Sequence, residues 1–204
     1  ATSLKLPVAS NFTLEYTLGD PVELREWKLQ GLPQDMFSIE NSLVVANTRR
    51  WPLLTDPQDQ AGTWIKNMEK GNGIQVITAN DPNLLRIVEN SIQMGIPVLI
   101  ENVGESIDPN MRPIYQKKLS LVAGRKVIRL GDVDVDYNPL FKLYMTCNLP
   151  NPSYTADVYT TLTVINFAVS KVDLSDQLLN MVVAHEKPEL EDQKDTLILE
   201  INKG

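Results

Sequence analysis

The residues most able to do chemistry lie between positions 51 and 66, where the pattern predicts a loop between an apolar strand and a helix. A phosphate-binding loop at such a place reads G-x-x-x-x-G-K-[ST]: backbone N–H groups surround the phosphates and the lysine pairs with their charge. The defining positions are occupied here by Asp56, Ala61, Gly62 and Thr63, of which only the threonine fits. Asp59 adds a second carboxylate. The sequence therefore predicts a nucleotide-binding scaffold without the chemistry that binds phosphate.

A second candidate pair follows the apolar run Ile96–Ile100. In a nucleotide hydrolase of this kind, acidic residues at the end of such a strand hold Mg²⁺ and activate the attacking water. Glu101 stands at the position of the magnesium ligand and Asn102 at that of the base, but asparagine cannot accept a proton from water at neutral pH. We favour the simpler interpretation that both residues only end a buried strand. Asn148 ends another strand at a sensor-like position, where polar residues are common in any case.

Other groups of acidic residues have simpler explanations than a site. Glu101 and Glu105 could act as paired carboxylates, although nothing nearby indicates a sugar or acyl substrate. Asp132, Asp134 and Asp136 alternate on one face of a strand. Calcium is conceivable there, but the glycine and the terminal glutamate of a calcium loop are missing, so a solvated hairpin face is the favoured interpretation.

Single residues of special chemistry also suggest ordinary roles. Cys147 has apolar neighbours and no base, which favours a small buried side chain over a nucleophile. The tryptophans at positions 27, 51 and 64 are expected to anchor the core or an interface. No arginine or lysine lies between Lys142 and Lys171, where an arginine serving a neighbouring subunit's site is expected, and Arg112 is a weak candidate for that role.

The composition excludes several classes of function. The 204 residues carry a net charge of −7, which argues against nucleic acid and anionic membranes as main partners. One cysteine excludes an internal disulfide, and with His185 as the only histidine we expect no metal site. The apolar runs are too short to cross a bilayer, and no signal sequence is recognisable. The abrupt start and end suggest a piece of a longer protein.

The hydrophobic pattern predicts strands alternating with helices, hence one α/β domain with a mainly parallel sheet and helices on both faces. The expected strands are Trp51–Thr55, Ile74–Thr78, Ile96–Ile100, Phe141–Thr146 and Thr161–Phe167, with a hairpin over Lys126–Leu130 and Val133–Tyr137 and a strand-like alternation over Phe12–Leu18. The expected helices are Asp20–Trp27, Asp35–Leu43, Thr63–Lys70, Asp81–Gly95, Asp108–Lys118 and Leu174–Val182. After Pro188 the spacing of Leu190, Leu197 and Ile201 is compatible with a surface tail or the start of a coiled coil.

Several motifs together resemble one known family. They are Gly31–Asp35 followed by Ser38, Glu40 and Asn41, then Arg50–Glu69, Ile96–Glu105, Asn148–Pro152, Asp176–Leu179 and Glu186–Glu191. In this order, over roughly residues 10–195, they resemble the fifth AAA+ module of dynein heavy chains. The sequence around Trp51 and over Trp64–Glu69 is more similar to axonemal than to cytoplasmic heavy chains. The chain departs from the family pattern at Thr55, Asp59 and Gly62, all in the degenerate loop.

The resemblance implies a P-loop NTPase-like (AAA+) fold with a hairpin insertion and a C-terminal helical extension. It implies a non-catalytic ring module, with no bound cofactor, that relays ATP-driven change, supports docking of the linker and carries the strut of the stalk. The implied parts are a lead-in at 1–49, an AAA+ core at 50–170 and a truncated helical segment toward the strut at 171–204. The implied partners are neighbouring modules, linker and strut, with the microtubule reached only indirectly in the cytoskeleton of a ciliary axoneme. The alternatives are a weak or regulatory nucleotide-binding or hydrolysing domain and a general adaptor domain.

Overall fold

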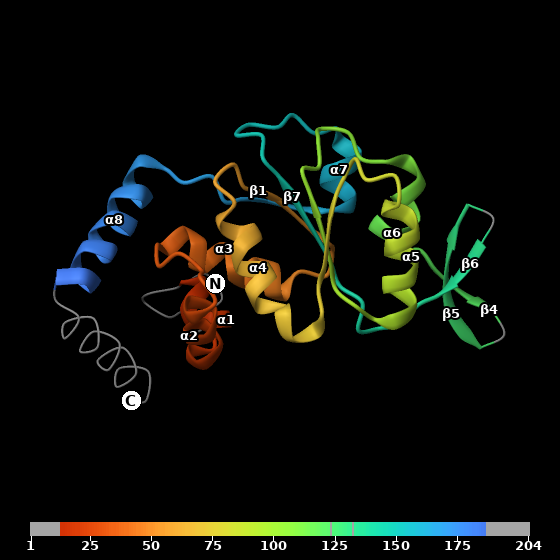
Figure 1. Ribbon diagram of the computed structural model, residues 1–204, viewed down its shortest axis with the longest axis horizontal. Coiled ribbons are helices and arrows are strands. Elements are labelled where there is room, and N and C mark those ends of the chain that lie inside the picture. The colour runs from red at the N-terminus through yellow and green to blue at the C-terminus, as the bar shows by residue number, and fades with distance from the viewer. Residues whose placement is uncertain (1–12, 123, 132, 187–204) are drawn as a thin grey trace, which may run out of the picture.

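The computed structural model describes residues 13–186 except 123 and 132 (Figure 1). Within those residues, five parallel strands form the central sheet in the order β2-β3-β7-β1-β8. Their bounds are β1 Pro52–Thr55, β2 Gln75–Thr78, β3 Val98–Glu101, β7 Leu143–Cys147 and β8 Thr163–Asn166. Each predicted strand of the sheet is therefore confirmed, with ends that differ by one or two residues. The parallel order places the carboxyl ends of β1, β3 and β7 along one edge.

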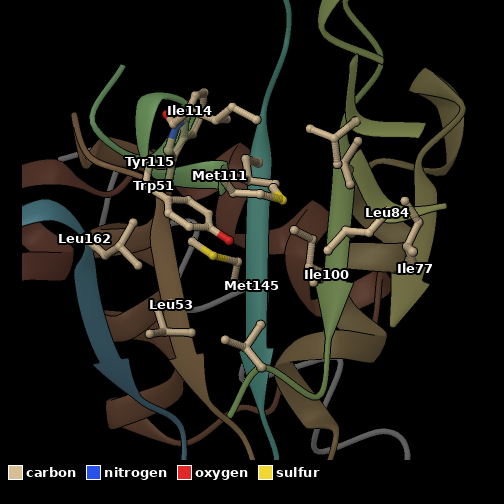
Figure 2. Packing of buried hydrophobic residues seen from close by; sticks show 14 of the residues in the cluster. Trp51, Leu53, Ile77, Leu84, Ile100, Met111, Ile114, Tyr115, Met145 and Leu162 are labelled. Atoms are coloured by element: carbon tan, nitrogen blue, oxygen red, sulfur yellow. The ribbon is translucent and has the colours of Figure 1, made fainter. Parts of the chain in front are cut away.

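Strand residues alternate between two apolar layers because successive side chains of a strand point to opposite faces. Leu53 and its sheet neighbour Met145 belong to one buried cluster, whereas Leu54 and Tyr144 belong to another. Figure 2 shows Leu53 and Met145 in the first cluster together with Trp51. Both faces of the sheet are therefore covered, as continuous apolar strands require.

The helices divide between these two layers (Figure 1). α2 Pro21–Leu29, α3 Met36–Asn47 and α4 Gln60–Met68 contribute to the cluster around Leu54, with the short α1 Leu14–Leu18 beside them. α5 Leu84–Met94, the 3₁₀ helix η3 Pro109–Met111, α6 Arg112–Tyr115 and α7 Ala156–Thr161 contribute to the cluster around Leu53. A second 3₁₀ turn, η2 Lys70–Asn72, follows α4. Trp27, Trp51 and Trp64 are buried, so their prediction as core anchors is confirmed.

Two additions extend from opposite ends of the molecule (Figure 1). In the described part of the chain, β4 Leu119–Val122, β5 Arg125–Leu130 and β6 Val133–Asp136 form an antiparallel sheet. The hairpin prediction is confirmed for β5 and β6, while β4 was missed. At the other end α8 Lys171–Glu186 leaves five large apolar side chains about half exposed: Leu174, Leu178, Leu179, Met181 and Val182.

Some local predictions were wrong. The alternation over Phe12–Leu18 does not make a strand: residues 14–18 form helix α1, capped by the Thr13 hydroxyl, which accepts a hydrogen bond from the Tyr16 N–H at 3.1 Å. Over so few residues, the helix cap at Thr13 outweighs an apolar pattern with a period of two. α4 begins at Gln60 rather than Thr63, so positions 61–63 belong to the helix. Helix α7 was not predicted. The expected seam at Leu190, Leu197 and Ile201 lies outside the described residues.

Candidate functional site

The loop between β1 and α4 is organised by the buried carboxylate of Asp56. Its Oδ1 accepts a hydrogen bond from the Gln60 N–H at 3.0 Å, and its Oδ2 accepts one from the Gly62 N–H at 2.9 Å. The Asp56 side chain is 1% exposed. A helix leaves its first N–H groups without partners, and these are the groups that bind phosphate in a phosphate-binding loop. An internal anion therefore occupies the place that the phosphate of a ligand would need.

The charge of Asp56 is balanced between opposing effects. Burial raises the pKa of the Asp56 carboxyl above its ordinary value, although the N–H groups of Gly62 and Gln60 stabilise the ionised form. The neighbouring carboxylate of Asp59 adds to the increase. Asp56 thus resembles a helix cap in its hydrogen bonds, but among the described residues no lysine or arginine forms an ion pair with it.

Asp59, Gly62 and Thr63 complete the first turn of α4. Asp59 adopts a left-handed backbone conformation (φ 54°), and its side chain makes no capping hydrogen bond. The Thr63 hydroxyl donates to the Asp59 carbonyl at 2.8 Å, so it satisfies the backbone. A Cβ atom at position 62 would lie far inside van der Waals contact with Asp59 Oδ1. A lysine at that position would fit only after Asp59 had moved.

A lysine nevertheless reaches this edge of the sheet from further along α4. Lys66 Nζ lies 2.6 Å from Glu101 Oε1, at the end of β3, and 3.6 Å from Asp59 Oδ2. The hydrogen bond to Glu101 is the main reason that the pKa of Lys66 is raised. Lys66 stands four positions after Gly62, outside the phosphate-loop pattern, and was not predicted as a site residue. Helical spacing is the signal that could have found it, because such a side chain points back toward the first turn.

The remaining predicted site residues take no part in these ion pairs. Asn102 is exposed and adopts a left-handed conformation (φ 57°) directly after β3. Asn148 is exposed after β7. Ala61 is buried in the apolar layer under α4. The structure therefore places Lys66 between Asp59 and Glu101, with Asp56 near Asp59, while the two asparagines follow the ends of strands.

A second buried carboxylate lies at the other end of α4. Glu69 is 1% exposed, and its Oε1 accepts hydrogen bonds from Lys142 Nζ at 2.8 Å and from the Tyr144 hydroxyl at 2.7 Å. The Asn72 amide donates to its Oε2 at 2.6 Å. Burial by itself would raise the pKa of Glu69, but the Lys142, Asn72 and Tyr144 hydrogen bonds outweigh it and hold the pKa below its ordinary value. Burial also raises the pKa of the Tyr144 hydroxyl, to which the Glu69 charge contributes.

The other candidates have structural partners. Glu105 Oε1 accepts from the Ser153 N–H at 2.8 Å. Arg112 pairs with Asp157 at 2.9 Å and Asp136 pairs with Arg125 at 3.1 Å, while Asp132 lies outside the described residues. Cys147 is buried, as predicted. Over the described positions, no three His, Cys, Asp or Glu residues are arranged to hold a metal ion. No described helix is long and apolar enough to cross a membrane.

The parallel sheet with helices on both faces and a capped loop after β1 define an α/β domain of the AAA+, P-loop NTPase-like kind. Residues 25–204 match the family described as the ATP-binding dynein motor region, and the chain belongs to that family. It is 50% identical to human dynein axonemal heavy chain 6 and 47% identical to human dynein axonemal heavy chain 3, in each case over 98% of this chain and 5% of the relative. It is 44% identical to mouse dynein axonemal heavy chain 2, over 98% of this chain and 4% of the relative. The chain thus spans about a twentieth of the length of these relatives.

Proposed function

We propose that this chain is a non-catalytic ring module, the fifth, of an axonemal dynein heavy chain. It neither binds nor hydrolyses nucleotide, and it transmits to its neighbours the movements that ATP drives elsewhere in the ring. Residues 1–49 lead into the module, residues 50–170 form its α/β core, and residues 171–204 lead toward the strut. Its partners are adjacent modules, the linker and the strut of the stalk, and it acts on microtubules only indirectly, in the ciliary axoneme.

The observation that carries this proposal is the Asp56 carboxylate on the first N–H groups of α4. A nucleotide phosphate would have to displace this buried anion and would then find no lysine at position 62. The nearest substitute, Lys66, is already paired with Glu101 at 2.6 Å. Both electrostatic requirements of phosphate binding are therefore unmet.

The same contacts support a mechanical role. Helix α4 is tied to three different strands: by Asp56 directly after β1, by Glu101 at the end of β3 through Lys66, and by Glu69 to Lys142 and Tyr144 at the start of β7. A ligand switches a domain between two conformations only if it binds one of them more tightly than the other. A domain that binds no ligand therefore has no such means of changing its own conformation. A helix held at both ends and in the middle moves with its sheet, and the module changes position as a rigid body through its interfaces.

Calorimetric titration of the chain with Mg-ATP and with ADP tests the proposal. We expect no binding heat and no thermal shift at millimolar nucleotide. The matched positive control is a variant in which Asp56→Gly, Asp59→Gly, Ala61→Gly and Gly62→Lys rebuild the pattern, and this variant should acquire binding. Saturable micromolar binding by the unaltered chain would refute the proposal. A folded control variant that binds nothing would show that these four positions are not what excludes nucleotide.

A weak, regulatory nucleotide site is the second candidate, and Lys66 favours it. Its ammonium group lies at the loop edge of the sheet together with Glu101, which stands at a magnesium-ligand position. If this candidate is right, Lys66→Met abolishes whatever nucleotide binding the titration detects. The exposed Lys70→Met, on the turn after α4, leaves that binding unchanged.

A further inference from the structure

A cavity of about 470 Å³ lies at the edge of the sheet opposite the degenerate loop. It opens beside Pro52, the first residue of β1, and Leu143, the first residue of β7. All three tryptophans of the chain line it. A cavity of this size, with an aromatic lining and a limited set of polar and charged groups that can orient a ligand, has the character of a small-ligand site.

One face of helix α2 contributes electron-rich groups to this cavity. Glu23, Glu26, Trp27 and Gln30 all line it, and their spacing places them on the same side of the helix. Neither glutamate has an ion-pair partner among the residues that the structure describes. Two free carboxylates beside an indole ring are the groups that recognise a guanidinium or ammonium ion.

Other elements contribute cations to the same cavity. Arg50 lines the cavity, and its Nη1 donates to the Tyr159 carbonyl at 3.3 Å. Lys117 donates to the Arg49 carbonyl, and its Nζ lies 3.8 Å from the centre of a Trp51 ring. Burial lowers the pKa of Lys117. Among the described side chains, no carboxylate lies within ion-pair distance of Arg50 or Lys117.

The cavity also contains hydrogen-bonding groups without partners. Over the described residues, three buried side-chain polar atoms have no partner, and two of them, Gln30 Oε1 and Trp64 Nε1, belong to residues lining this cavity. Trp64 is 0% exposed. A buried unpaired donor or acceptor destabilises the fold unless something satisfies it. Because both atoms are closed to solvent, a ligand that offers a donor and an acceptor would satisfy them only after the wall of the cavity had rearranged.

We infer that this cavity binds an amphoteric ligand, in which a guanidinium or ammonium group lies against Glu23, Glu26 and Trp27 while a carboxylate pairs with Arg50 and Lys117. The six formal charges lining the cavity, on Glu23, Glu26, Glu69, Arg50, Lys117 and Lys142, sum to zero. Since Glu69 and Lys142 pair with each other at 2.8 Å, the groups left for a ligand are acidic on α2 and basic elsewhere. A ligand with a single charge would leave one of the two sets unpaired. A free basic amino acid and a peptide segment with a basic and an acidic side chain share this chemistry.

The three indole N–H signals of the ¹⁵N-labelled chain all come from residues that line this cavity, because the chain has no other tryptophan. The probes are N-acetyl-L-arginine, which has both charges, N-acetylagmatine, which keeps the guanidinium and the amide but lacks the carboxylate, and an Arg-Ala-Glu peptide with blocked ends. We expect N-acetyl-L-arginine to move the Trp64 signal saturably and N-acetylagmatine to bind about tenfold more weakly, because it forgoes a charge pair. The tripeptide binds more tightly if the natural source is a peptide, and more weakly if it is a free amino acid.

Variants of the exposed lining residues keep the test independent of folding. Glu23→Gln with Glu26→Gln should abolish the response to N-acetyl-L-arginine, and Arg50→Gln should reduce its affinity toward that of N-acetylagmatine for the unaltered chain. The matched control is Glu15→Gln, an exposed glutamate on α1 that does not line the cavity. No movement of the Trp64 signal with any probe would overturn the inference. Equal affinity for N-acetylagmatine and N-acetyl-L-arginine, or an unchanged response in the double variant, would overturn it too.

Discussion

The two ends of helix α4 hold two carboxylates that are equally buried and oppositely affected. Asp56 and Glu69 are each 1% exposed. Among the described residues, the Asp56 carboxylate accepts hydrogen bonds from backbone N–H groups, and burial raises its pKa. The Glu69 carboxylate accepts from an ammonium group and a hydroxyl, and its pKa is lowered. The difference shows that burial does not by itself decide what a carboxylate does in a core. The charge of its partners decides whether it strengthens the fold when ionised.

The largest loss of stability is expected from removing the Glu69 side chain. Glu69→Ala leaves the Tyr144 hydroxyl buried without an acceptor, while Lys142, whose side chain is 54% exposed, can turn to water. We therefore expect a loss of about 3 kcal/mol in the free energy of unfolding, at the low end for breaking a buried pair. Urea denaturation measures it. Glu69→Gln, which keeps an acceptor for Tyr144, should cost less than half as much. If the alanine variant loses under about 1 kcal/mol, Glu69 does not tie α4 to β7.

Substitution of Asp56 should cost less stability, and the same substitution at Asp59 is its matched control. Asp56→Asn replaces an oxygen that accepts from a backbone N–H with an NH₂ group, so we expect a loss of about 1 kcal/mol. Asp59→Asn removes the same charge from a residue whose carboxylate makes no capping bond, and asparagine tolerates its left-handed conformation. That variant should stay within about 0.5 kcal/mol of the unaltered chain. Equal losses in the two variants would mean that charge, rather than capping, is what α4 requires.

The contributions of Glu69 and Asp56, at the two ends of α4, should change with pH in opposite directions. The lowered pKa of Glu69 means that its contribution is present above the ordinary value of 4.5 and is lost as the pH falls through the folded-state pKa. The raised pKa of Asp56 means the reverse: its contribution is complete below the ordinary value of 3.8 and is lost as the pH rises through the folded-state pKa. The stability difference between the unaltered chain and Glu69→Gln should therefore shrink in acid. The difference from Asp56→Asn should grow in acid, and parallel slopes would contradict the comparison.

The sequence predicts one end of α4 better than the other. Local rules favour an acidic cap directly before a helix, and Asp35 caps α3 in this way through the Ser38 N–H at 2.9 Å. At α4 the same rules predict a cap but select Asp59, which makes no capping bond, whereas Asp56, three residues earlier, accepts from the first N–H groups. The contacts of Glu69 join positions separated by 73 and 75 residues, and no spacing within one element encodes them. The strands of the main sheet were predictable because their apolar runs are buried on both faces. Strand β4 was missed because all four of its side chains are exposed.

The smallest effect is expected midway along α4, at the pair of Lys66 and Glu101. The distance of 2.6 Å is short, but the two side chains are 34% and 23% exposed, so water screens much of their attraction. A double-mutant cycle with Lys66→Met and Glu101→Gln should yield a coupling below about 1 kcal/mol, declining further as salt is added. Asp59, 3.6 Å from the same ammonium group, offers a second partner when Glu101 is neutralised. A coupling above about 2 kcal/mol that salt leaves unchanged would mean that the pair of Lys66 and Glu101 behaves like a buried ion pair, as the contacts of Glu69 do. Helix α4 would then be held most firmly at its centre and its carboxyl end.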